Sequence, residues 1–513
     1  MNLLLLLILP LIGGALAWGL SRDRPVACRW ALVMALALGL ALTVWVWATA
    51  TPGPGPWLAE VQWPWVPSLG ISFHLALDGL SLLMVALSYF LGLAAVLASW
   101  DSLRRQVGFF HFMLGLVLTG IIGVFLAADL FLFYFCWELM LIPMVFLIAL
   151  WGHENRRYAA LKFALFTQAG GLMLLLAILG LYVAHGRATG VYTFDYTQLL
   201  GTSVGPVAAL WLALGFFVAF AVKLPAVPLH TWLPDAHTEA PTAGSVILAG
   251  LLLKTGGYGL IRFVLPLFPE AAAQLAPTAM VLGVVGILYG AALAFAQTDL
   301  KRLVAYTSVS HLGFVLLGVF ARNDEGLRGA VVQMVCHGLS TGALFILVGA
   351  LQDRLGTRDM RRMGGLWAQA PGLSIALLLF ALASLGLPGM GNFVGEFLVL
   401  LGTYRVGVAL TAAGAGGLVL AAVYSLRIMQ VVCFGPPRER LELPDLGRRE
   451  KALMAAMLIA LLWIGWFAQP VLNAAAPPAA QTQDAAPAGP PHGMHMLPTS
   501  PHSGGPTARG NAP

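Results

Sequence analysis

Long uninterrupted apolar runs are the feature that most constrains the fold of this chain. Hydrocarbon offers the backbone no water to bond with, so an apolar run of about 20 residues crosses a bilayer as a helix. Such runs, separated by Pro, Gly and charge clusters, recur along the chain. We place about fourteen candidate spans, at 2–20, 29–49, 76–99, 108–127, 130–150, 160–184, 207–230, 243–265, 273–297, 303–321, 328–350, 372–402, 406–433 and 452–470.

Composition supports this interpretation and excludes other classes of protein. Of the 513 residues, 59% are hydrophobic and 10% charged, whereas a soluble domain carries about 25% charged residues. The net charge of +6 is scattered through short loops, so we expect no nucleic-acid partner. Cys28, Cys136, Cys336 and Cys433 lie far apart, and the sequence has no phosphate-binding loop. We therefore expect an all-α polytopic membrane protein with no metal site or cofactor in this chain.

Loop charges predict the orientation in the membrane. Lys and Arg accumulate in cytoplasmic loops, and most of them fall in the odd-numbered loops. The even-numbered loops and the tail hold only Arg187, Arg262, Arg322, Arg328, Arg405 and Arg509. This asymmetry predicts that both termini lie outside, on the periplasmic face if the membrane is a bacterial inner membrane. The first run is interpreted as a retained span, because no Lys or Arg precedes it.

Four ionisable residues lie inside predicted spans, where a Lys, Arg or Asp costs about 2.5 to 3.5 kcal/mol at the centre. They are Glu138, Lys223, Lys254 and Glu396. Because apolar residues flank each of them, a purely structural role is the weaker reading. A structural or snorkelling role is favoured instead for four residues near span ends, namely Asp129, Lys162, Asp299 and Lys301.

Two of these spans are expected to be broken. Pro225, Pro228 and Pro234 follow Lys223, and the twelfth span contains LGLPGMG at 385–391. Breaks of this kind free backbone carbonyls inside the membrane and are typical of transporters whose ion path crosses at mid-membrane. A simple kink is the alternative.

Three histidines accompany the buried charges. They are His230, seven residues after Lys223, and His311 and His337 on consecutive spans. A single membrane histidine is usually a packing residue, but next to buried Lys and Glu a proton relay is favoured, because imidazole titrates near neutral pH.

These segments resemble the antiporter-like subunits of respiratory complex I, NADH:quinone oxidoreductase. The resemblance covers most of residues 70–435 and is most specific in KLPAVPLHTWLPDAHTEAPTAGSVILAGLLLKTGGYGLIR, LKRLVAYTSVSHLG and QMVCHGLSTGALF. Related subunits usually carry lysine in the span of GNFVGEF, whereas the subunit M type carries glutamate. Glu396 therefore favours the subunit M type.

The resemblance implies the fold and the roles of the buried residues. It implies fourteen helices with two inverted five-helix repeats, broken in spans 7 and 12. Glu138 would pair with Lys223, Lys254 would be the central lysine, and Glu396 would exchange protons with one side of the membrane. His230, His311 and His337 fall where the family has its connecting histidines.

The expected organisation follows from the spans and the resemblance. Residues 1–107 hold three spans and an external loop at 50–75; 108–265 form the first repeat, spans 4–8; and 266–433 form the second, spans 9–13. Residues 434–470 form a cytoplasmic loop and the last span. The Ala/Pro/His-rich tail 471–513 is expected to be disordered.

The functional hypothesis is a proton-translocating subunit of the membrane arm, lying between two sister subunits. Burial lowers the pKa of a lysine and a nearby carboxylate raises it, so moving Glu138 would make Lys223 release its proton. FMN, iron-sulfur clusters and quinone would bind other subunits, so any enzymatic activity belongs to the complex. The alternatives are a subunit of a multisubunit Na⁺/H⁺ antiporter or membrane-bound hydrogenase, and a structural subunit that conducts nothing.

Overall fold

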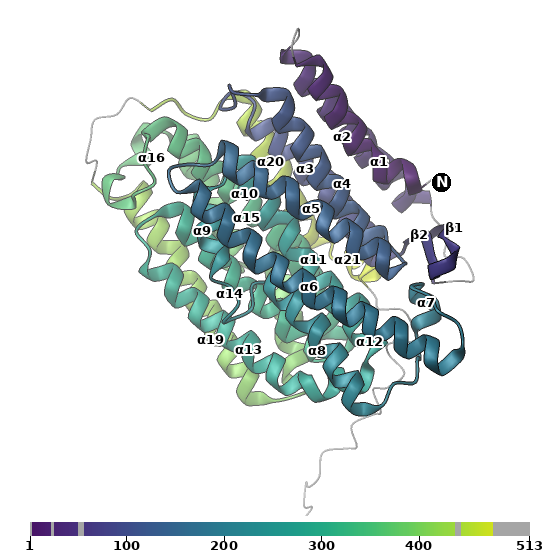
Figure 1. Ribbon diagram of the computed structural model, residues 1–513. Helices are drawn as coiled ribbons and strands as arrows, with labels where there is room; N and C mark the ends of the chain where they lie inside the picture. Colours follow the sequence, from purple (N-terminus) through teal and green to yellow (C-terminus); the bar gives the residue numbers. More distant parts are fainter. Residues whose placement is uncertain (1–2, 22–24, 50–55, 437–442, 476–513) are drawn as a thin grey trace, which may run out of the picture.

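The apolar runs form long helices that pack side by side (Figure 1). The computed structural model describes residues 3–21, 25–49, 56–436 and 443–475. Within these ranges, twelve helices are long and apolar enough to cross a membrane. They are α1 (Leu3–Leu20), α2 (Pro25–Thr49), α3 (Gly79–Ala98), α4 (Val107–Leu126), α5 (Leu130–Trp151), α6 (Arg156–Thr189), α8 (Pro206–Lys223), the segment Thr242–Leu267, α13 (Pro269–Ala296), α14 (Leu300–Phe320), α15 (Asp324–Leu355) and the segment Val408–Cys433.

The other two predicted spans are not among these twelve. The twelfth is divided into α17 (Pro371–Ser384) and α18 (Gly391–Tyr404), and the last is α20 (Arg448–Trp466), which begins with charged residues. The remaining short helices are α7 (Tyr196–Leu199), α9 (Trp232–Glu239), α16 (Leu366–Gln369), α21 (Gln469–Ala474), η1 (Pro67–Leu69) and η4 (Met360–Arg362).

The predicted class, a mostly helical polytopic membrane protein, is confirmed. The count of fourteen spans, the inverted repeats and the domain boundaries stay predictions. The expected disorder is wrong at the start of the tail, because α21 extends to Ala474. The rest of that prediction, residues 476–513, lies outside the described residues.

The core lies in the middle of the bundle. Helices α1 and α2 pack with α3 and α4 at one edge, and α13 and α19 (Val408–Ile428) lie at the opposite side (Figure 1). Between them, the most apolar stretches of α14, α15 and Thr242–Leu267 are 94%, 94% and 100% buried. These three segments are therefore the best shielded from lipid.

Both predicted helix breaks are confirmed. Helix α8 ends at Lys223, and a non-helical stretch containing Pro225 and Pro228 leads to α9. Proline has no N–H and blocks the preceding helical turn, so it ends the helix there. The indole of Trp232 donates to the carbonyl of Val222 at 2.9 Å, which satisfies a freed backbone group inside the protein.

The segment Thr242–Leu267 contains two π-helical turns that the sequence analysis did not foresee. α10 (Thr242–Ile247) is followed by η2 (Leu248–Leu252), α11 (Leu253–Gly259), η3 (Leu260–Val264) and α12 (Leu265–Leu267). A π turn holds an extra residue and is frequent at functional sites. The first one ends two residues before Lys254, and a third, η5 (Met429–Cys433), ends the segment that begins with α19.

A β-hairpin occupies the predicted external loop, so the expectation of a purely helical chain is incomplete. Strands β1 (Ala59–Val66) and β2 (Ile71–Leu77) pair antiparallel, with an irregularity near Pro64. Proline fits an edge strand because no partner strand needs its missing N–H.

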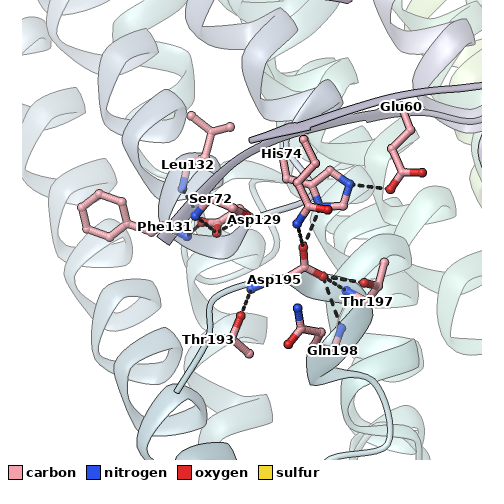
Figure 2. A network of polar contacts seen from close by, with 11 residues as sticks. Glu60, Ser72, His74, Asp129, Phe131, Leu132, Thr193, Asp195, Thr197 and Gln198 are labelled. Carbon is pink, nitrogen blue, oxygen red and sulfur yellow. Dashed lines mark hydrogen bonds and ion pairs between the residues drawn. The ribbon is translucent and has the colours of Figure 1, made fainter. Parts of the chain in front are cut away.

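A polar network fixes this hairpin to the segment after α6 (Figure 2). The imidazole of His74 bonds through Nδ1 to Asp195 and through Nε2 to Glu60, both at 2.7 Å. Asp195 also caps α7 by accepting from the amides of Thr197 and Gln198. The strand, the loop and a helix start therefore share one buried carboxylate.

The prediction that Arg262 belongs to an even-numbered loop is wrong. It lies inside the buried segment Thr242–Leu267 and not in an even-numbered loop. Its guanidinium forms an ion pair with Asp78, which caps α3, and lies 5.2 Å from the ring of Trp57. Buried charges are tolerated when paired in this way, so Arg262 carries no information about orientation.

We predict that the hairpin is held most firmly near neutral pH. Burial lowers the pKa of His74, but hydrogen bonds and charge from Asp195 and Glu60 outweigh it and raise the pKa above 6.5. Burial raises the pKa of Asp195, but its bonds to His74 and Thr197 lower it below 3.8 overall. The histidine's stabilisation is lost as pH rises through its folded pKa, and the aspartate's as pH falls through its own.

The measurement is the hydrogen-exchange protection factor of β1 and β2 amides at about pH 6 and about pH 9. Protection should fall at the higher pH in the wild type and change less in His74→Gln. His185, whose ring bonds to the neutral hydroxyl of Thr202, provides the control variant His185→Gln. Equal pH dependence in His74→Gln and the wild type would contradict the assignment.

Candidate functional site

The four ionisable residues singled out from the sequence all lie within the bundle. Lys223, Lys254 and Glu396 are 1%, 0% and 1% exposed, and Glu138 is half-buried. Removing a charge from water costs several kcal/mol unless protein groups replace the water. Which groups surround each charge therefore determines what the site can do.

The charge of Glu138 acts on the ammonium of Lys223, but the two side chains do not form an ion pair. Glu138 lies on α5, and Lys223 is the last residue of α8. The Lys223 ammonium has no hydrogen-bond partner and lies 5.3 Å from the ring centre of Trp137 and 5.5 Å from that of Phe163. Aromatic faces stabilise a cation only partly. Among the residues that the structure describes, Glu138 is the charged neighbour that attracts the Lys223 ammonium, so the charge of Lys223 depends on it.

A glycine provides the room for the Glu138 carboxylate. A Cβ at Gly171 on α6 would lie 2.4 Å from Glu138 Oε1, an oxygen with no hydrogen-bond partner. Tyr134 and Gln168 lie beside the same carboxylate. Within the described part of the chain, Glu138 Oε1 is therefore not held by a hydrogen bond.

Lys254 is held by two neutral groups. Its ammonium donates to the carbonyl of Ala249 at 2.5 Å and contacts His337 Nδ1 at 2.6 Å. Ala249 lies in the first π turn. Lysine has no acceptor, so when Lys254 is charged, Nδ1 of His337 accepts and the ring proton lies on Nε2.

Glu396 continues this line of groups through His311. His311 Nδ1 lies 2.9 Å from Glu396 Oε1, and the ring centres of His311 and His337 are 5.7 Å apart. Lys254, His337, His311 and Glu396 therefore form a line from Thr242–Leu267 through α15 and α14 to α18, with its one wide interval between the two imidazoles.

Three neutral residues missed by the sequence analysis position this end of the line. Tyr424 and Ser384 bond to His311 Nε2 at 2.9 and 3.1 Å, and Gln333 donates to Glu396 Oε1 at 2.9 Å. Neutral polar residues are common in apolar helices, so nothing in the sequence distinguished them. Their role depends on contacts between distant helices.

The second helix break provides space for Glu396. Gly386, between α17 and α18, has φ +77°, and a Cβ there would lie 2.5 Å from Glu396 Oε2. Left-handed backbone favours glycine, so this position requires glycine for two reasons.

Two further histidines, His230 and His237, are buried outside this line of groups. His230 is buried with its ring centre 5.7 Å from that of Tyr289, and its Nδ1 has no hydrogen-bond partner. His237, which the sequence analysis did not single out, is fully buried and interacts electrostatically with Lys254. Its signal was weak because TWLPDAHTE reads as a polar loop.

The residues near span ends follow two patterns. Asp129 caps α5 and Asp299 caps α14, while Lys162 forms an ion pair with Asp235 at 2.7 Å, as a structural role predicts. For Lys301 the structural role remains open, but snorkelling is wrong. Its side chain is 1% exposed and its ammonium donates to the carbonyl of Ala240 at 2.5 Å.

Comparisons with known proteins show which family this chain is similar to. The family described as "NADH:quinone oxidoreductase/Mrp antiporter, TM" matches residues 127–421. NADH-quinone oxidoreductase subunit M of Pseudomonas aeruginosa is 54% identical over 92% of this chain and 95% of its own.

Two solved structures share the fold. A chain of respiratory complex I from Thermus thermophilus, solved with bound NADH, aligns with TM-score 0.83 and 34% identity, covering 92% of this chain and 98% of its own. A chain of the Mrp complex from a Dietzia species aligns with TM-score 0.81 and 26% identity, covering 94% of this chain but 52% of its own. The high identity and the nearly complete coverage on both sides show that this chain belongs to the subunit M family of NADH-quinone oxidoreductases.

Proposed function

We propose that this complex I subunit moves protons along Lys223, Lys254, His337, His311 and Glu396, driven by changes at Glu138. The observation that carries the proposal is the buried line in which Lys254 contacts His337 and His311 contacts Glu396. A buried row of groups that can each gain or lose a proton is what a membrane proton path requires.

The first step would take place at Glu138 and Lys223. Lys223 has no hydrogen-bond partner, so its charge depends on the carboxylate across from it. Moving or neutralising Glu138 leaves the ammonium among aromatic rings, where the neutral amine is favoured. Lys223 then gives its proton to the interior of the protein, through buried water that bridges the distance to Lys254.

Later steps would use contacts that already exist. Lys254 can pass a proton to Nδ1 of His337, which then releases one from Nε2. His311 passes a proton to Glu396, while Tyr424 and Ser384 hold its ring in place. Water or a small rotation bridges the two imidazoles. His230 stays a candidate relay residue, and its approach to the path is through the break after α8.

The other subunits of the complex would supply the cofactors and the neighbouring surfaces. FMN, iron-sulfur clusters and quinone would bind other subunits, so electron transfer occurs elsewhere and acts on Glu138 through a neighbouring subunit. The two sister antiporter-like subunits are the proposed neighbours on either side. The proposed location is a bacterial inner membrane with both termini in the periplasm.

We predict that Glu138→Gln and Lys223→Met abolish most coupled proton uptake. Removing a positioned proton-transfer group costs about 100-fold in the step it serves, so uptake should approach background. The measurement is NADH-driven proton uptake by inverted membrane vesicles, with assembly checked by native gel.

Lys162→Met is the matched control. Lys162 is partly exposed and pairs with Asp235, and loss of such a pair costs about 1 kcal/mol or less. This variant should pump at nearly the wild-type rate. Assembled Glu138→Gln and Lys223→Met complexes that also pump normally would show that the buried pair is structural.

We predict that Gly386→Ala impairs pumping more than Gly389→Ala. Both glycines have positive φ, +77° and +96°, so each alanine adds strain of about 1–3 kcal/mol. Only at Gly386 would the Cβ meet the Glu396 carboxylate, since at Gly389 the nearest heavy atom lies 3.6 Å away. Proton uptake of assembled complexes is the measurement, and equal losses would mean that strain alone matters.

A further inference from the structure

Arg427 is a charged residue inside a membrane span that the proposed path does not use. It lies in the last turn of α19, within the span Val408–Cys433. Its guanidinium lies 4.5 Å from the ring centre of Phe295, in the last turn of α13. Among the described residues, this guanidinium has no hydrogen bond or ion pair. Charges within a span are normally paired, so the acceptor for its N–H groups lies in what surrounds the protein.

The side chain of Arg427 lines a groove of about 730 Å³ where α13 and α19 end. Most of the lining is apolar and exposed, including Phe295, Val423, Leu426 and Phe434. Against bulk lipid, one arginine in an apolar groove needs an anion beside a hydrocarbon chain. A phospholipid carries both in one molecule.

Polar and apolar groups follow one another along the groove in the order that a phospholipid requires. Val423 lies one turn before Arg427, about 6 Å deeper in the span at 1.5 Å per residue. Gln430 and Phe434 follow Arg427 at intervals of three and four residues, and all four residues line the groove. The apolar end of the groove therefore points into the membrane, and the arginine and the amide lie nearer its surface.

An aromatic pair and nearby charges indicate that this end of the groove lies at the level of the lipid headgroups. The ring of Trp367, which is exposed, lies 5.0 Å from that of Phe434. Tryptophan is enriched at the membrane–water interface. Charged residues also begin here, since Asp299 follows the last residue of α13 by three positions. Arg427, one to two turns inside, is within reach of a lipid phosphate.

The charge of the groove favours an acidic headgroup over a zwitterionic one. The part of its lining that the structure describes contains one cation, Arg427, and no carboxylate. A guanidinium matches the geometry of phosphate, whereas no group in this lining would pair with the ammonium of a zwitterionic lipid. Basic pockets between membrane helices are known to bind acidic headgroups.

We propose that the groove at the ends of α13 and α19 binds one phospholipid with an acidic headgroup. Arg427 donates to its phosphate, Gln430 contacts the polar part of the lipid, and an acyl chain lies along Val423 and Leu426. The site is independent of the proton path, because none of these residues belongs to the line from Lys223 to Glu396.

Two alternatives make different predictions. Arg427 could snorkel to whichever phospholipid is nearest, in which case the groove would not distinguish one headgroup from another. A neighbouring subunit could instead cover the groove, in which case no lipid would reach it in the assembled complex.

The experiment uses the assembled complex in phosphatidylcholine nanodiscs that contain a phosphatidylglycerol probe with a photoreactive acyl chain. We expect the probe to label residues 423–434 of this chain, as mapped by mass spectrometry of its peptides. Unlabelled phosphatidylglycerol should reduce the labelling more than phosphatidylethanolamine does, and inorganic phosphate should leave it unchanged. This part of the test needs no variant.

Variants then test the role of the arginine. Arg427→Gln should lower the labelling about tenfold, because a hydrogen bond to a charged group is worth at least that factor. Val423→Trp keeps the charge but fills the apolar end of the groove, so it should also lower the labelling. Arg361→Gln is the control, since Arg361 lies at the same end of the bundle, is largely exposed and pairs with Asp359. It should label like the wild type, and a native gel checks assembly.

Four results would overturn the site. Equal labelling of Arg427→Gln and the wild type, or equal competition by the two unlabelled lipids, would mean that the arginine only snorkels. Absence of labelling in the wild type would mean that another subunit covers the groove, and displacement by inorganic phosphate would mean a simple anion site. Labelling is measured without NADH, so each of these results leaves the proposed proton path untouched.

Discussion

Shielding of charge from lipid is the constraint on which this structure depends. Lys254 and Glu396 are ionisable groups inside an apolar bundle, and such groups are tolerated there where protein groups surround them. The best-buried segments, Thr242–Leu267, α14 and α15, lie in the middle of the bundle and carry Lys254, His311 and His337. The helices that are best shielded from lipid are therefore the ones that carry these ionisable side chains.

Departures from regular helix make this arrangement possible. The break after α8 ends a helix at Lys223, a π turn supplies the carbonyl that Lys254 contacts, and the break before α18 carries Gly386 beside Glu396. Each departure frees backbone groups or space that a regular helix would fill. Within a bilayer they are tolerated because other protein groups satisfy them.

Much of the site could be predicted from the sequence, because a charge in an apolar run stands out without knowledge of its partners. Glu138, Lys223, Lys254 and Glu396 were found in this way, and the breaks followed from Pro and Gly. Tyr424 could not be found, since it is neutral and its partner His311 lies 113 positions away in the chain. Snorkelling was the wrong expectation for Lys301, because proximity to a span end does not determine whether packing encloses a side chain. The hairpin was missed because its Trp and Pro residues also fit an interfacial loop.

The ion pair of Arg262 with Asp78 has a consequence for how the protein is made. The two residues are 184 positions apart, and ribosomes add about 5–20 residues per second, so Asp78 waits roughly 10–40 s for its partner. During that time the carboxylate is solvated, protonated or paired with another cation. The start of α3 therefore reaches its final surroundings only after Thr242–Leu267 has been synthesised.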